Sequence, residues 1–126
     1  MKKSLLCIIA LLILAPLSSC SKGEKGPLLE KGLIDLSSHD FSLTASPLAG
    51  EWELYWNQLL TPYDFRKDET RPAILSAVPG DWSRNTGLPS FGVATYRAKV
   101  RLPASDSLYA IRIPRVMTSY ILWVDG

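Results

Sequence analysis

Apolar and polar side chains alternate along one short stretch, GEWELYWN, which occupies residues 50–57. Successive side chains of an extended strand point to opposite sides, so a period of two is typical of a strand with one buried face. The stretch therefore predicts a half-buried strand with an aromatic inner face. Its inner positions are Trp52, Leu54 and Trp56, and its opposite face carries Glu51, Glu53, Tyr55 and Asn57.

The same alternation predicts five further strands. It is clearest over residues 93–102, VATYRAKVRL, where small or apolar residues alternate with threonine, arginine and lysine. Residues 107–114 keep the alternation, and residues 119–124 are apolar on both faces, as expected of an interior strand. Residues 33–36 and 73–78 are weaker candidates.

The connections between these stretches are rich in turn-forming residues. Short strands separated by glycine and proline predict an all-β sandwich. The one helical signal is TPYDF at residues 61–65, where Thr61 can cap a single turn and Pro62 can occupy its first position. The turn residues are Pro79, Gly80, Gly87, Pro89 and Gly92.

The first 19 residues have the composition of a secretory signal. Lys2 and Lys3 precede an apolar run over residues 5–14, and small residues follow it. Ten helical residues span only about 15 Å, roughly half of a bilayer core, so the run predicts a cleaved leader and not a membrane span. The sequence LSSC ending at Cys20 resembles the bacterial lipoprotein signal, which implies cleavage before Cys20 and acylation of its thiol and new amine.

This resemblance predicts a protein held in the cell envelope by a lipid at Cys20, with residues 20–30 as a flexible tether and residues 31–126 as the binding domain. The other cysteine, Cys7, leaves with the leader, so the mature chain has no second cysteine for a disulfide. Loss of Lys2 and Lys3 leaves 12 basic and 12 acidic residues. A neutral chain without a basic run predicts no nucleic-acid partner.

The last residues, YILWVDG at 120–126, are strongly β-prone and finish on Asp-Gly, a preferred pair for a tight hairpin turn. A hairpin turn predicts a return strand after it. We therefore expect these 126 residues to be the front portion of a longer product, or a truncated gene.

Few residue types in the mature chain suit catalysis. The single histidine, His39, has no cysteine or second histidine with which to build a zinc site, and we expect it to be an exposed loop residue. Glu51 and Glu53 share a strand face and could form an acid–base pair, but they lie opposite the tryptophans, which favours a solvated surface. No phosphate-binding glycine pattern is present. The sequence predicts a non-enzymatic chain with no catalytic residue, metal or cofactor.

The candidate ligand residues lie around Trp82, which we expect in a loop with Arg84 and Asn85 nearby. An aromatic face with polar neighbours suits a sugar ring, because the apolar face of the sugar stacks while its hydroxyl groups take hydrogen bonds. The alternative is that Trp82 closes one end of the sandwich as a structural plug.

Several segments together resemble the extracytoplasmic domain of bacterial seven-transmembrane receptors with diverse intracellular signalling modules. The similarity covers about residues 33–126 and implies a jelly-roll β-sandwich of the galactose-binding-like type that senses carbohydrate or a related small molecule. It also implies seven membrane helices and a signalling module after Gly126. The segments are LAGEWELYW, QLLTP, VPGDW, GVATYRAKV and YILWVDG.

The same skeleton is also similar to the N-terminal sugar-binding domain of β-galactosidase and β-glucuronidase type glycosidases, whose catalytic glutamates belong to a separate barrel. A third hypothesis is a free-standing envelope lipoprotein. A lipid at Cys20 would be redundant beside seven membrane helices, and Ser21 resembles signals that direct lipoproteins to an outer membrane. Which membrane holds the chain is therefore left open.

Overall fold

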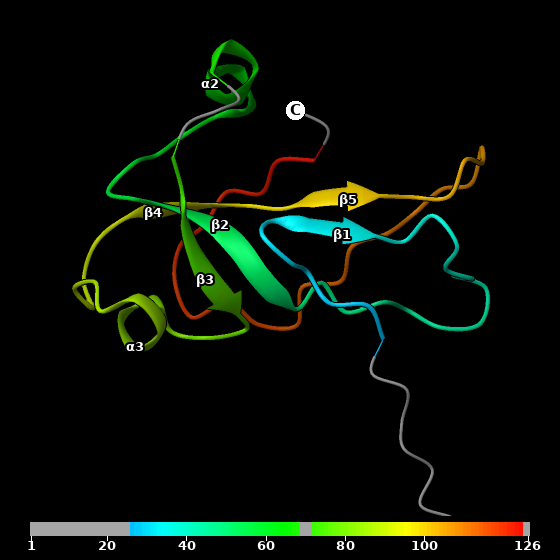
Figure 1. The fold of residues 1–126 in the computed structure, drawn as a ribbon, viewed down its shortest axis with the longest axis horizontal. Helices are drawn as coiled ribbons and strands as arrows, with labels where there is room; N and C mark the ends of the chain where they lie inside the picture. The colour runs from blue at the N-terminus through cyan, green and yellow to red at the C-terminus, as the bar shows by residue number, and fades with distance from the viewer. Residues whose placement is uncertain (1–25, 69–71, 125–126) are drawn as a thin grey trace, which may run out of the picture.

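The computed structural model describes residues 26–68 and 72–124. Within these residues five strands form two sheets, and two short helices lie at opposite ends of the described fold (Figure 1). The regular structure of the described residues is mainly β, which confirms the predicted all-β class. The elements are β1 (Leu33–Asp35), β2 (Gly50–Trp56), α2 (Pro62–Lys67), β3 (Ile74–Val78), α3 (Trp82–Thr86), β4 (Ala94–Arg97) and β5 (Lys99–Arg101).

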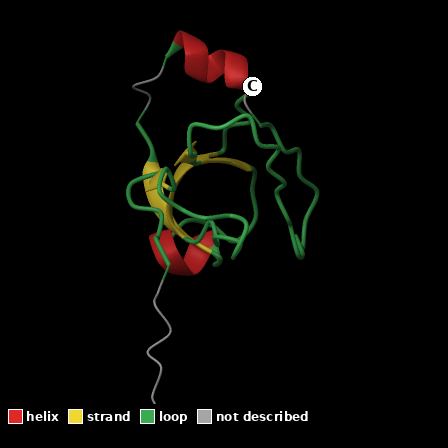
Figure 2. Cartoon of the chain, turned by 90° about the vertical axis from the view of Figure 1, so that its right-hand side faces the viewer, coloured by secondary structure: helices red, strands yellow, loops and turns green. Residues whose placement is uncertain are grey.

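The larger sheet has the order β3-β2-β4 with antiparallel neighbours, and the smaller sheet pairs β1 with β5 in parallel. Gly32 joins the two sheets, because its N–H donates to the carbonyl of Glu51 at 2.8 Å and its carbonyl accepts from the N–H of Lys99 at 2.7 Å. Figure 2 shows the strands as one curved arc with loops across its hollow side.

The predicted strand over residues 93–102 is present but divided. Its first half, β4, pairs with β2, and its second half, β5, pairs with β1, with Ala98 between them. The alternation is continuous through both halves, so the pattern did not reveal that the strand changes partner.

Two predicted strands are wrong. Residues 107–114 and 119–124 form no ladder with any described strand, and most of their large apolar side chains are exposed. Alternation indicates which face of a strand would be buried, but a strand also needs a neighbouring backbone to satisfy its N–H and C=O groups. These residues run along the sheets without such a neighbour (Figure 1).

The buried core is small and begins earlier in the chain than the predicted domain boundary at residue 31. Leu29, assigned to the tether from sequence, is only 1% exposed, and its backbone bonds to Ala49 and Glu51. Leu29, Ile34 and Leu36 form the central cluster, and the partly buried side chains that pack against it are Phe41, Leu48, Trp52 and Ala98.

The tryptophans of β2 therefore pack as predicted, at the margin of the core. Trp52 contacts the central cluster, and its indole N–H donates to the carbonyl of Leu48 at 2.9 Å. Trp56 is half-buried and meets Trp82 edge to face, with 5.2 Å between ring centroids. Both rings fill space within the fold.

Candidate functional site

The predicted ligand residues lie on α3, and the expectation of a loop there is wrong. Asp81 begins the helix, since its side chain accepts from the N–H of Ser83 at 2.8 Å. Gly87 ends the helix with a left-handed φ of 74°, a conformation that glycine adopts easily. Both signals are present in the sequence DWSRNTG, but a helix of five residues is too short to show periodicity.

The side chains of α3 are used mainly to hold the helix in place. The indole N–H of Trp82 donates to the carbonyl of Pro89 at 2.8 Å, and the amide of Asn85 donates to the carbonyl of Ala77 at 3.1 Å. The side chain of Arg84 is 87% exposed and lies 3.9 Å from the carboxylate of Asp81. These contacts fit the plug interpretation of Trp82, while ligand binding by Trp82, Arg84 and Asn85 stays a prediction.

The second face of β2 is not the solvated surface that the sequence predicted. The ring of Tyr55 is buried beneath α2, where it meets Phe65 edge to face at 5.1 Å between centroids. The Tyr55 hydroxyl donates to Glu53 at 2.9 Å, and the Glu53 carboxylate lies 3.7 Å from the guanidinium of Arg97. Burial, with a further effect of Glu53, raises the pKa of Tyr55. Glu51 is exposed, so only one of the two glutamates was placed correctly.

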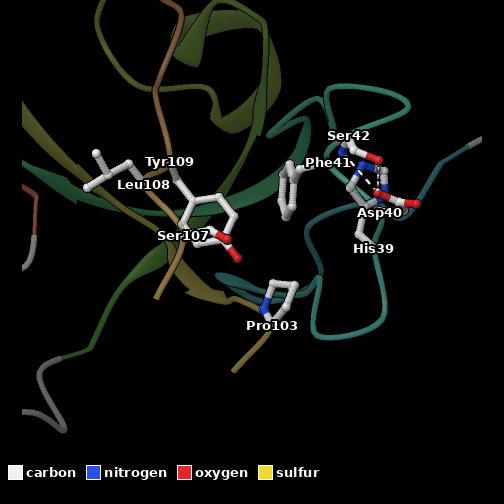
Figure 3. Close-up of a pocket in the computed structure, with 8 residues that line it drawn as sticks. All are labelled: His39, Asp40, Phe41, Ser42, Pro103, Ser107, Leu108 and Tyr109. Atoms are coloured by element: carbon white, nitrogen blue, oxygen red, sulfur yellow. Dashed lines mark hydrogen bonds between the residues drawn. The ribbon is translucent and has the colours of Figure 1, made fainter. Parts of the chain in front are cut away.

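A hollow of about 370 Å³ opens between two segments that are far apart in the chain (Figure 3). One segment follows β1 and the other follows β5, and the parallel pairing of these strands brings the two segments together. The volume is in the range of small-molecule sites. We call it the 39–109 hollow, and its lining residues are His39, Asp40, Phe41, Ser42, Pro103, Ser107, Leu108 and Tyr109.

Aromatic rings form the middle of the 39–109 hollow. Phe41 packs against the core and stands between two rings, with 4.6 Å between its centroid and that of His39 and 5.1 Å to that of Tyr109. Figure 3 shows Tyr109 and Ser107 at one end, Phe41 in the middle, and His39, Asp40 and Ser42 at the other end. The lining therefore has different chemistry at its two ends.

The polar end of the hollow is fixed by its own hydrogen bonds. One oxygen of Asp40 accepts from the Ser42 N–H at 2.9 Å and from the Ser42 hydroxyl at 2.6 Å. These bonds lower the pKa of Asp40, and His39 lowers it further, so the side chain is a carboxylate at neutral pH. The His39 ring nitrogen Nε2 lies 3.0 Å from the carbonyl of Thr44. At the other end, the hydroxyl of Tyr109 lies 2.9 Å from that of Ser105.

Sequence analysis did not find this hollow. It placed His39 in an exposed loop, whereas the ring is half-buried and meets Phe41 edge to face. It placed Tyr109 on one face of the strand predicted over residues 107–114, which the structure does not form. The motif SHDFS contains an aromatic residue between a carboxylate and hydroxyls, but only the tertiary fold places it beside residues 103–109.

A second, larger hollow lies along the outer side of β1. It has a volume of about 650 Å³ and a more open, apolar lining. Its lining residues are Pro27, Leu28, Glu30, Lys31, Leu33 and Asp35.

Over residues 26–68 and 72–124, no three His, Cys, Asp or Glu side chains are grouped so as to hold a metal ion. Within the same ranges, no helix has the length and apolar character needed to cross a bilayer. Cys20 and the leader lie outside the described residues. Comparisons with protein-family models, with curated proteins and with solved structures find no match to this chain.

Proposed function

We propose that this chain is a non-catalytic, envelope-facing domain that binds a carbohydrate or related small molecule for a membrane signalling receptor. In this proposal a lipid at Cys20 tethers the domain, and its complete fold is a jelly-roll sandwich of the galactose-binding-like type. The sequence segments that resemble the seven-transmembrane receptors support the receptor part of the proposal.

The observation that supports carbohydrate binding is the 39–109 hollow. It offers the rings of Phe41 and Tyr109 for the apolar face of a sugar, and the carboxylate of Asp40 with the hydroxyls of Ser42 and Ser107 for its hydroxyl groups. Pockets that combine apolar walls with a few fixed polar groups are the usual form of small-ligand sites. Asp40 and Ser42 are already ordered by their mutual bonds, which reduces the entropy lost on binding.

The test is to titrate the protein in its natural, full-length form with a panel of neutral mono- and disaccharides. Calorimetry or changes in NMR chemical shifts would measure the binding. Binding should be weakened about fivefold or more in Tyr109→Ala, since the sugar loses the aromatic face against which it packs, a contact of about 1 kcal/mol. Phe91→Ala is the control, because Phe91 is 94% exposed and lies outside the hollow. Absence of binding to every sugar would overturn the carbohydrate proposal.

The proposal that the domain belongs to a membrane receptor is tested separately, by reading the coding sequence downstream of codon 126. Seven apolar runs of about 20 residues each would support the receptor. An alternating strand–helix barrel of some 250 residues would instead support the glycosidase hypothesis.

A further inference from the structure

We infer that the 39–109 hollow selects a ligand of about two sugar units that carries a positively charged amine, with the ammonium group at Asp40 and a sugar ring at Tyr109. This inference rests on the proposed carbohydrate-binding function and specifies its ligand class.

The two ends of the hollow differ in what they can recognise. Tyr109, Ser107 and Pro103 offer a ring and a hydroxyl at one end, and Asp40 and Ser42 offer a carboxylate and a hydroxyl at the other (Figure 3). Phe41 stands between them. A single sugar ring stacked at Tyr109 leaves the acidic end without a partner, whereas a longer ligand occupies both ends.

The lining has one fixed charge, and it is negative. Among the described residues that line the hollow, Asp40 is the only acidic one and none is lysine or arginine. An anionic ligand would meet the carboxylate with no opposing cation, while an ammonium group would gain an ion pair. The ring of Phe41 adds an aromatic surface to the lining, against which ammonium groups are also stable.

The carboxylate is held in place for this role without being neutralised. Ser42 donates two hydrogen bonds to the same oxygen, Oδ1, and these bonds fix the orientation of the group while leaving its charge unchanged. Among the described residues, no lysine or arginine forms an ion pair with Asp40 like the pair between Arg101 and Asp35 at 2.8 Å or the pair between Arg84 and Asp81 at 3.9 Å. Asp35, Asp40 and Asp81 each accept hydrogen bonds from the serine two residues further along the chain. Of these three, Asp40 lines the hollow, and in the described part of the chain it lacks the arginine neighbour that Asp35 and Asp81 have.

The experiment compares three β-1,4-linked disaccharides of the same shape: cellobiose, its diamino analogue with both amines protonated, and the N-acetylated form of that analogue. Calorimetric titration of the protein in its natural form should show the diamine binding about fivefold tighter than cellobiose, which corresponds to about 1 kcal/mol. The N-acetylated form, which has lost the charge, should bind like cellobiose. A fourth ligand, the uronic acid of cellobiose, carries a negative charge and should bind most weakly.

The decisive variant is Asp40→Asn, because the asparagine side-chain oxygen can still accept both bonds from Ser42. It should remove the preference for the diamine, so that the diamine and cellobiose bind to the variant with affinities within about twofold of each other. Asp81→Asn is the matched control: Asp81 makes the same pair of bonds to Ser83, at 2.8 Å each, on α3 and outside the hollow. The control should keep the fivefold preference.

The outcomes separate this inference from the proposed function. If cellobiose and the diamine bind equally well, or if Asp40→Asn keeps the preference, the inference is overturned while carbohydrate binding stands. If the protein binds none of these sugars, both fall. If the diamine binds and every neutral sugar fails, the carbohydrate proposal, which is tested with neutral sugars, is overturned together with the inference that rests on it.

Discussion

Glu53 and Arg97 lie directly opposite each other on β2 and β4, and their side chains meet at 3.7 Å beneath α2. The two side chains are 22% and 18% exposed, and the guanidinium of Arg97 also stands 4.4 Å above the ring of Phe65. One cross-strand pair therefore connects the central strand of the larger sheet to the helix that covers it.

Replacing Arg97 with alanine should lower the free energy of unfolding by about 2–4 kcal/mol, because a partly buried carboxylate loses its ion pair and Phe65 loses its contact. Urea unfolding measures the change. The control is Arg101→Ala, which breaks the exposed 2.8 Å pair with Asp35 and should cost about 0–1 kcal/mol. If both variants lose the same free energy of unfolding, the position of the Glu53–Arg97 pair under α2 does not make it more stabilising than an exposed pair.

Gly50 should be one of the least replaceable residues of the fold. It has a φ of 130°, and a Cβ there would lie 2.6 Å from the nitrogen of Leu29 and even nearer to its carbonyl oxygen. Leu29 is buried and bonded on both sides, so this backbone cannot move aside. Gly50→Ala should cost about 4 kcal/mol or abolish folding.

Gly87→Ala gives the comparison for Gly50, because Gly87 also has a positive φ, of 74°, but nothing lies within 4 Å of the added carbon. Only backbone strain remains there, about 1–2 kcal/mol. Thermal unfolding of both variants measures the difference. A Gly50→Ala protein as stable as Gly87→Ala would show that the approach of Leu29 to Gly50 is looser than described.

Trp52→Ala should cost about 3 kcal/mol, at the lower end of the range for large aromatic truncations, because the ring is half-buried against Leu29, Ile34 and Leu36. Trp52→Phe keeps most of the apolar volume and removes only the 2.9 Å bond to Leu48, so it should cost about 1 kcal/mol. Chemical denaturation measures both. Loss of sugar affinity in Trp52→Ala without loss of stability would place this ring in a binding site and not in the core.

When residues 1–126 are expressed without any downstream segment, Cys20→Ala should release the mature protein from membranes into the soluble fraction, because stable anchoring requires more than one acyl chain and these chains are expected on Cys20. Fractionation of cells and mass spectrometry of the intact protein measure the effect. Cys7→Ala is the control, since Cys7 lies in the leader and should leave anchoring unchanged. Unchanged sedimentation of the Cys20 variant would argue against the lipid.

Acid should weaken the fold through Asp35, Asp40 and Asp81. Hydrogen bonds from the serine two residues further along hold the folded-state pKa of each below the ordinary value of 3.8. Each aspartate therefore stabilises the fold above pH 3.8, and this contribution is lost as the pH falls through the lower folded pKa. Urea midpoints measured stepwise below about pH 4 should fall less steeply in the triple Asp→Asn variant than in the unchanged protein.

The sequence was sufficient to locate the strands that pair with another strand in the structure, and the short helix that follows Thr61. Alternation over Gly50–Trp56 and the capping residue at 61 are local signals, and both are confirmed. Tyr55 was misplaced because the alternation does not show that α2 covers the second face of β2. The 39–109 hollow was missed for a related reason, because it exists only where Phe41 meets Tyr109, 68 positions later in the chain.

The parallel pairing of β1 with β5 also determines the order in which the protein can assemble. Leu33 and its partner Lys99 are separated by most of the described chain, with the β2–β3–β4 sheet between them. During synthesis or export, the N-terminal strand must wait without its ladder partner until residues near 100 emerge, while the antiparallel pair of β2 and β3 can already form. Closing so large a loop is slow. Molecular chaperones that bind nascent chains should therefore have most time to bind around residues 29–36.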